Sequence, residues 1–199
     1  MSDVYHLKTP VSIEDIKPLR SGDRVIISGY IYTARDAAHR RLIELIDEKK
    51  ELPIPIEGQV MYYVGPSPAP PGRVIGAAGP TTSYRMDPYT PKLLELGLKV
   101  MIGKGKRSKE VKEAIVKYKA VYMAAIGGAG ALMAKAIKEA RVVAYQDLGP
   151  EAIRELKVEK LPAIVVNDMA GNDLYLEGQK MYKSIDDATV KSHIPPPLV

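Results

Sequence analysis

The sequence of 199 residues contains no cysteine, no tryptophan and no phenylalanine, and it has only three histidines. Without cysteine, the chain cannot form a disulfide framework, use a cysteine nucleophile, or hold zinc or an iron–sulfur cluster through its own thiolates. The histidines His6, His39 and His193 are too few to favour a zinc site built from this chain alone. We therefore expect no metal site made of this chain's own residues.

Long hydrophobic runs are also missing. No segment approaches the ~20 apolar residues that a membrane-spanning helix needs. The first ten residues, MSDVYHLKTP, contain no apolar stretch of the kind found in secretory signal peptides. These absences predict a cytoplasmic protein without a membrane partner.

The charge of the chain is moderately positive, with a formal net charge of +5 and a pI of about 9.2. The basic residues are spread thinly, and Glu110 interrupts the densest run, residues 104–112. Without Trp or Phe, and with scattered tyrosines, no aromatic stacking platform accompanies a basic stripe. The pattern does not favour nucleic-acid binding, whereas a modest positive excess suits small anionic substrates.

The composition, 46% hydrophobic and 27% charged, is that of an ordinary globular protein of one domain or two tightly packed lobes. In the first half, hydrophobic patterning predicts strands at residues 25–32, 59–64 and 73–78. It also predicts two helices. These are expected at residues 37–50, capped by Asp36, and at residues 90–97, with Thr90 as N-cap and Pro91 in the first turn.

The second half alternates between strands and helices. Strands are expected at residues 99–102, 120–126, 142–145 and 162–167. Helices are expected at residues 108–119 and 130–139, and a turn at residues 171–172 predicts a returning strand at residues 173–177. The alternation predicts an α/β fold with a β-rich first half and a partly parallel sheet in the second half.

Polar residues follow three of the expected strands, in residues 33–36, 79–87 and 102–106. Ligands of open α/β sheets bind beyond the carboxyl ends of the strands, so we expect these stretches to meet. Together they offer three cations and three hydroxyl groups: Arg35, Arg85, Lys104, Thr81, Thr82 and Ser83. Two guanidinium groups and an ammonium group make a suitable receptor for a dicarboxylate. For each arginine alone a surface ion pair is favoured, but three basic residues after three separate strands are less easily explained in that way.

Other polar motifs leave alternatives open. The glycine-rich residues 127–131 match a dinucleotide-binding fingerprint only in part, and close helix–strand packing or a helix N-terminus facing an anion is favoured. His39, beside Arg40 and Arg41, suits a solvated helix face as well as a site. The Asn-Asp pairs at residues 167–168 and 172–173 suit an Asx turn, so we assign them no chemistry.

Six motifs occur in a characteristic order: TARDAAHRR, YYVGP, GPTTSYRMD, IGKG, AIGGAGAL and LPAIVVNDMAGNDLY. In combination they resemble the β subunit of class I, iron–sulfur-dependent fumarate hydratase and L(+)-tartrate dehydratase, which forms the C-terminal domain in single-chain members. The resemblance covers residues 7–178. It implies a swivelling β/β/α domain over residues 1–178, and we expect the polar residues 179–199 to form a peripheral C-terminal arm.

The resemblance implies a hydro-lyase that adds water to, or removes it from, a four-carbon dicarboxylate. The family's [4Fe–4S] cluster is held by three cysteines of a partner α subunit, and its open iron binds the substrate hydroxyl. The absence of cysteine here agrees with that division, and an α2β2 assembly is implied. The chain alone, monomeric or as a homodimer, would be colourless and inactive.

Residue by residue, the resemblance places substrate carboxylates against Arg35, Arg85 and Lys104. It places Thr81 near the carbon that gains or loses a proton, as the catalytic residue of this chain. Asp36 and His39 match motif positions without a role being implied. Fumarate and tartrate remain alternative substrates, and a non-catalytic module that binds small anions remains an alternative function.

Overall fold

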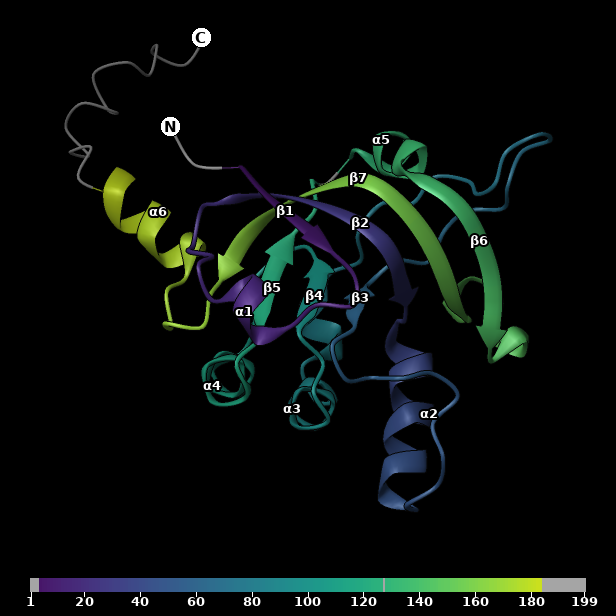
Figure 1. The fold of residues 1–199 in the computed structure, drawn as a ribbon, viewed down its shortest axis with the longest axis horizontal. Coiled ribbons are helices and arrows are strands. Elements are labelled where there is room, and N and C mark those ends of the chain that lie inside the picture. The colour runs from purple at the N-terminus through teal and green to yellow at the C-terminus, as the bar shows by residue number, and fades with distance from the viewer. Residues whose placement is uncertain (1–3, 127, 184–199) are drawn as a thin grey trace, which may run out of the picture.

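The computed structural model describes residues 4–126 and 128–183 (Figure 1). The strands are β1 (Val4–Lys8), β2 (Arg24–Thr33), β3 (Val60–Tyr62), β4 (Val100–Gly103), β5 (Val121–Ala124), β6 (Ile137–Ala144) and β7 (Ile153–Asn167). The helices are α1 (Ile13–Ile16), α2 (Asp36–Asp47), α3 (Thr90–Glu95), α4 (Lys109–Tyr118), α5 (Gly130–Ala136) and α6 (Leu174–Tyr182). Two 3₁₀ turns complete the described part, η1 (Ser83–Met86) and η2 (Gln146–Glu151).

Five strands pair in a closed ring. Strands β2, β3, β4 and β5 are parallel neighbours, and β7 runs antiparallel to both β5 and β2. Strand β1 adds to the first half of β2, and β6 adds to the first half of β7. Because the ring closes through β2 and β7, these strands have hydrogen-bonded neighbours along both edges and expose little unpaired backbone.

The two faces of the strands bury different apolar side chains. Within β3 and the residue after it, Val60 and Tyr62 belong to the cluster inside the ring, whereas Met61 and Tyr63 belong to a second cluster shared with the helices. This alternation follows from the period of two in a β-strand. Helices α2, α3 and α4 lie together on one side of the sheet, and α5 lies on the other (Figure 1).

Local capping fixes several helix ends. The Ser108 hydroxyl accepts a hydrogen bond from the Val111 amide at the start of α4, and Lys119 closes that helix in the left-handed conformation. The Asp173 carboxylate accepts hydrogen bonds from the Tyr175 and Leu176 amides at the start of α6. An aspartate in this position favours a helix, so the returning strand expected at residues 173–177 is wrong.

The strand expected at residues 73–78 is also wrong. The segment turns back on the proline-rich stretch before it, and the Ala77 amide donates to the Ser67 hydroxyl. A Cβ atom at Gly76 would overlap Ser67, so this contact depends on glycine. The N-cap of α3 is Tyr89 and not Thr90, because the Thr90 hydroxyl donates to the Met86 carbonyl.

The α/β class is confirmed, with strands in both halves of the chain. The strands are not concentrated in the first half as expected, because β6 and the 15-residue β7 lie in the second. Helix α5 ends at Ala136, and β6 begins where the helix was expected to continue. Helix α6 runs across residue 178, the expected boundary of the arm, and residues 184–199 lie outside the described part.

Candidate functional site

The four candidate residues follow the ends of neighbouring strands or lie on the segment between them. Arg35 is the N-cap residue of α2, two residues after the end of β2, and Lys104 directly follows β4. Thr81 and Arg85 lie on the segment that enters and forms η1. The parallel pairing of β2, β3 and β4 turns their carboxyl ends the same way, which is why distant parts of the sequence meet here.

Arg35 and Arg85 meet at one carboxylate, that of Asp36. Arg85 Nε lies 2.6 Å from Asp36 Oδ1, and Arg35 Nη2 lies 3.6 Å from Asp36 Oδ2. Glu151 Oε1 lies 3.1 Å from Arg35 Nη2, and the Glu151 side chain also accepts from the Ala37 amide at 3.0 Å. The expected surface ion pairs of the two arginines are thus one shared network.

Thr81 and Lys104 are joined through the backbone. The Lys104 amide donates to the Thr81 carbonyl at 3.2 Å, and the Ser83 amide donates to the Lys104 carbonyl at 2.8 Å. The Thr81 amide in turn donates to the Tyr63 carbonyl at 2.7 Å. These bonds extend the sheet beyond β3 and β4, so the position of Thr81 is set by the sheet itself.

Gly65 links the two pairs of residues. Val64 forms an antiparallel bridge with Pro80, next to Thr81. A Cβ atom added to Gly65 would lie 2.7 Å from Arg35 Nη1, so the guanidinium packs directly on this backbone. The structure therefore brings all four predicted residues to one edge of the sheet.

His39 is fully buried, so the solvated helix face considered for it is wrong. Its Nδ1 donates to the Arg35 carbonyl at 2.8 Å, and its ring packs edge-on against Tyr63 at 5.4 Å between centroids. Burial lowers the pKa of His39 to about 4, so the ring is neutral near pH 7. A neutral imidazole here supports the backbone of Arg35 and adds no charge to the site.

Arg107, a buried residue that the sequence did not single out, holds the end of η1 in place. The Arg107 guanidinium donates to the Asp87 carboxylate at 2.6 Å and to the Thr90 hydroxyl at 2.7 Å. It also lies 4.9 Å from the centre of the Tyr122 ring. Arg107 stands in the basic run of residues 104–112, and no local signal separates it from its exposed neighbours.

Glu151 and the bridging role of Asp36 were missed as well. Glu151 lies in η2, 116 positions after Arg35 in the sequence, and its contact depends on how η2 packs against α2. The sequence indicated Asp36 as the cap of the helix, but α2 begins at Asp36 and its N-cap residue is Arg35, so that expectation is wrong. Both contacts depend on the tertiary arrangement, which the hydrophobic periodicity of the sequence does not encode.

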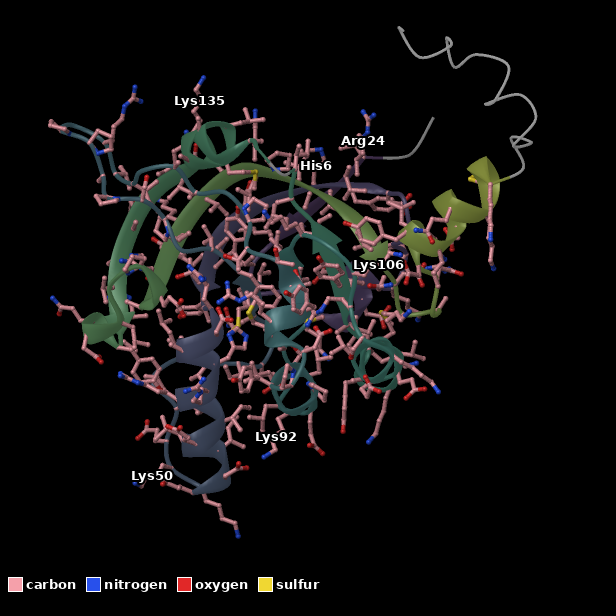
Figure 2. The ribbon with its side chains drawn as sticks, turned by 180° about the vertical axis from the view of Figure 1, so that it is seen from behind. His6, Arg24, Lys50, Lys92, Lys106 and Lys135 are labelled. Atoms are coloured by element: carbon pink, nitrogen blue, oxygen red, sulfur yellow. The ribbon has the colours of Figure 1, made fainter. Side chains whose placement is uncertain are left out.

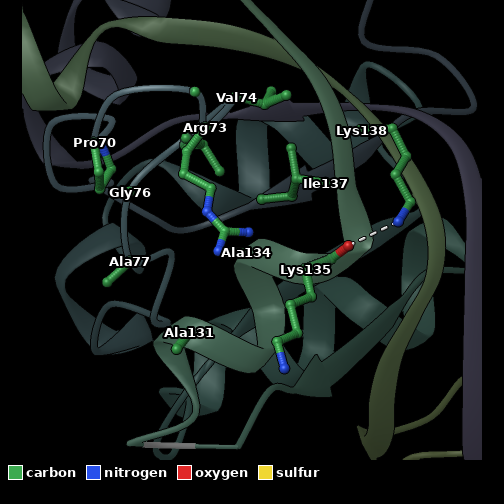
Figure 3. A pocket seen from close by; sticks show the side chains of 12 residues that line it. Pro70, Arg73, Val74, Gly76, Ala77, Ala131, Ala134, Lys135, Ile137 and Lys138 are labelled. Atoms are coloured by element: carbon green, nitrogen blue, oxygen red, sulfur yellow. Dashed lines mark hydrogen bonds between the residues drawn. The ribbon is translucent and has the colours of Figure 1, made fainter.

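A hollow of about 680 Å³ lies between residues 70–77 and α5 (Figure 3). Arg73 extends into it, and Lys138 donates to the Lys135 carbonyl at 2.9 Å. The lining of this hollow includes none of the four candidate residues. A Cβ atom at Gly130 would lie 3.2 Å from the Gly79 nitrogen, so the glycine-rich segment serves close packing, as favoured from the sequence.

The wider surface carries its basic side chains at separate places. Lys50 and Lys92 lie at one end of the molecule, Lys135 at the opposite end, and Lys106 apart from both (Figure 2). Among residues 4–126 and 128–183, no group of three His, Asp or Glu side chains could hold a metal ion. No helix in this part of the chain is long and apolar enough to cross a membrane.

Comparison with known proteins gives the family. A sequence model described as "Fumarase C-terminus" matches residues 2–178. The chain belongs to this family. The resemblance carried by the six sequence motifs is thereby confirmed.

The relatives of this Fumarase C-terminus chain are of two lengths. "Fumarate hydratase class I, anaerobic" of Escherichia coli is 43% identical over 154 residues, which are 76% of this chain and 28% of that protein. "Fumarate hydratase 1, mitochondrial" of Leishmania major is 41% identical over 160 residues, 79% of this chain and 29% of that protein. "Putative L(+)-tartrate dehydratase subunit beta" of Methanocaldococcus jannaschii is 37% identical over 181 residues, 87% of this chain and 93% of that protein. The chain therefore spans less than a third of these two fumarate hydratases.

Proposed function

We propose that this chain is the β subunit of a hydro-lyase that reversibly hydrates fumarate to malate in an active site shared with an α subunit. The observation that carries the proposal is the meeting of Arg35, Arg85, Lys104 and Thr81 at one sheet edge in a member of the fumarase family. Three cations beside a hydroxyl group suit a substrate with two carboxylates and one reacting carbon.

Arg35, Arg85 and Lys104 bind the substrate carboxylates in this proposal. A guanidinium group pairs with a carboxylate through two parallel hydrogen bonds, which fixes orientation as well as position. When a proton leaves the carbon next to a carboxylate, negative charge develops on that carboxylate. Cations that are already in place stabilise this charge without reorganisation, so they favour the transition state.

Thr81 exchanges the proton with the substrate carbon. A threonine hydroxyl is a poor base on its own, because it stays protonated at neutral pH. An acidic residue of the α subunit would have to relay the proton to and from the hydroxyl. The backbone hydrogen bonds on both sides of Thr81 support a fixed position for that exchange.

The iron–sulfur cluster implied by the resemblance does not fit the donor set of this chain. The sequence has no cysteine, and the described residues contain no cluster of other metal-ligating side chains. We assign a [4Fe–4S] cluster to the α subunit, where it supplies Lewis-acid chemistry at the substrate hydroxyl. The present chain contributes carboxylate binding and the proton at Thr81.

The name of one relative supports a partner subunit for this chain. The fumarate hydratases carry this sequence within much longer chains, and the Methanocaldococcus jannaschii protein, named a β subunit, has nearly the same extent as this chain. This supports a separate α subunit, which we propose to form an α2β2 complex in the cytoplasm. The name of the latter relative also favours tartrate dehydration as a second candidate function.

Co-expression with a cluster-bearing α subunit and an anaerobic assay of fumarate hydration test the proposal. We expect Arg85→Ala to lower kcat/KM by tenfold or more, because a charge-assisted contact of about 1.5–3 kcal/mol is lost. Arg24→Ala, which removes an exposed arginine of β2, is the matched control and should leave kcat/KM unchanged.

The same preparation decides between the candidate functions. Turnover of L-tartrate and not of fumarate would select tartrate dehydration. Tight calorimetric binding of fumarate, malate or tartrate by the isolated chain, with no hydration by the complex, would indicate an anion-binding module. An unchanged kcat/KM in Arg85→Ala would refute the carboxylate clamp.

A further inference from the structure

We propose that Asp36 is a positioning residue, which holds the guanidinium groups of Arg35 and Arg85 at the spacing that a dicarboxylate needs. This inference rests on the proposed function and extends it to a residue to which the family resemblance gave no role. Asp36 touches both arginines, and they come from two different elements. It acts through them and need not touch the substrate.

The contact with Arg85 leaves the end of its guanidinium group open. Asp36 Oδ1 accepts at Arg85 Nε, 2.6 Å away, and not at the two terminal nitrogens. Within the described residues, this ion pair is the one recorded for Arg85, whose side chain is 44% exposed. The two terminal nitrogens can therefore form the bidentate pair with a substrate carboxylate.

Arg35 is held from the opposite side. Its Nη2 lies between Asp36 Oδ2, at 3.6 Å, and Glu151 Oε1, at 3.1 Å. Two guanidinium groups placed side by side repel each other, and an intervening carboxylate offsets that repulsion. Asp36 thus allows Arg35 and Arg85 to stand close together before the substrate arrives.

Asp36 is itself fixed in place. It occupies the first turn of α2, where the helix dipole favours a negative charge. Its Oδ1 atom is held by Arg85 Nε at 2.6 Å, whereas its buried Oδ2 atom has no hydrogen-bond partner among the described residues. The alternative role for Asp36 is that of a competitor, whose carboxylate occupies the place of a substrate carboxylate and has to leave when the substrate binds. A positioning residue stays where it is when the substrate binds.

If Asp36 is a positioning residue, removing its charge should weaken substrate binding, whereas if it is a competitor, removing its charge should strengthen it. In the complex with its α subunit, Asp36→Asn should weaken binding of succinate tenfold or more, measured by calorimetry. Succinate is a suitable probe, because this four-carbon dicarboxylate has neither the double bond nor the hydroxyl needed for reaction. The KM for fumarate should rise to a similar extent while kcat changes by less than about threefold.

A matched control lies on the same helix. Asp47 ends α2 and pairs with Lys92, away from the site, so Asp47→Asn should change neither succinate binding nor KM. If Asp36→Asn does not assemble with the α subunit, Asp36→Glu replaces it. Glutamate keeps the charge but displaces it by one methylene, so it should also weaken succinate binding.

A double variant tests whether Asp36 acts through Arg85. We expect Asp36→Asn to weaken succinate binding by less than threefold when Arg85 is already alanine, since the group that it positions is gone. Tighter succinate binding in Asp36→Asn would show a competitor and overturn the inference. The inference would also be overturned if Asp36→Asn weakened succinate binding as much in the Arg85→Ala background as in the wild type, or if Asp36→Asn alone had no effect.

Failure of the inference is distinguishable from failure of the proposed function. If Arg85→Ala weakens succinate binding while Asp36→Asn does not, the carboxylate clamp stands and only the role of Asp36 is wrong. If Arg85→Ala leaves succinate binding unchanged, both are wrong.

Discussion

Gly65 offers a way to move Arg35 without removing it. A Cβ atom at this position would lie 2.7 Å from Arg35 Nη1 and 3.0 Å from its Cδ, below the 3.5–4.0 Å at which such atoms attract. Gly65 does not have a positive φ, so the backbone tolerates alanine. In Gly65→Ala, the Arg35 side chain therefore has to retreat by roughly 1 Å.

The effect should fall on substrate binding and spare stability. An arginine that withdraws from a carboxylate loses a charge-assisted contact of about 1.5–3 kcal/mol, which corresponds to about 10- to 150-fold in affinity. Alanine also reduces the entropy of the unfolded chain by roughly 0.4–1 kcal/mol, which offsets the cost of moving a flexible side chain. We expect Tm to change by less than about 4 °C.

Steady-state kinetics of the complex with its α subunit test this expectation, with KM rising and kcat nearly constant. Gly178→Ala is the control, because a Cβ atom there meets no neighbouring atom within 4 Å and should leave KM unchanged. An unchanged KM in Gly65→Ala, with Arg35→Ala impaired, would refute the steric reasoning. A loss confined to kcat would refute the assignment of Arg35 to ground-state binding.

Two further predictions concern stability. Gly103→Ala places a Cβ atom onto the Ser83 hydroxyl and 2.9 Å from Tyr63 Cδ2, and should lower the free energy of unfolding by about 1–3 kcal/mol; calorimetry showing an unchanged Tm would contradict this. Burial lowers the pKa of His39 in the folded chain to about 4, below its ordinary value of 6.5. The unfolded chain therefore binds the proton more tightly than the folded chain does. Up to about 3 kcal/mol of the free energy of unfolding should be lost as the pH falls from 6.5 to 4. Urea titrations should show a shallower pH dependence for His39→Phe, and equal slopes would refute the role of His39.

The sequence predicted those elements that have a clear internal pattern. The helices at residues 36–47 and 109–118 show amphipathic spacing, the second of them also has the capping residue Ser108, and β4 and β5 are short buried runs. The first half of β7 escaped prediction because it mixes charged residues such as Glu155 and Lys157 with buried Leu156 and Val158. The closure of the ring depends on pairing between β2 and β7, more than a hundred residues apart, which no local pattern encodes.

The sequence likewise predicted part of the candidate site, namely which segments meet, but not the contacts between their side chains. Polar residues after strands indicated that the Arg35 and Lys104 segments meet, since the topology of parallel strands brings their ends together. The Arg85 segment was grouped with them through an expected strand at residues 73–78 that the structure does not contain. The partners of the arginines were not predictable in this way. Whether Asp36 caps a helix or bridges two guanidinium groups depends on where η1 and η2 pack, and this is decided by side chains throughout the second core cluster.

The charges at the site support an active centre that this chain does not complete alone. Arg35 pairs with Asp36 and Glu151, Arg85 pairs with Asp36, and Lys104 lies at the same sheet edge, so the five groups together carry one net positive charge. A dicarboxylate brings two negative charges, and burying it here would leave one uncompensated, which is costly in a site closed to water. On the proposed function, the α subunit must therefore supply further positive charge or hydrogen-bond donors as it closes over the substrate. The isolated chain should therefore bind succinate more weakly than the complex does, which calorimetry on both preparations would show.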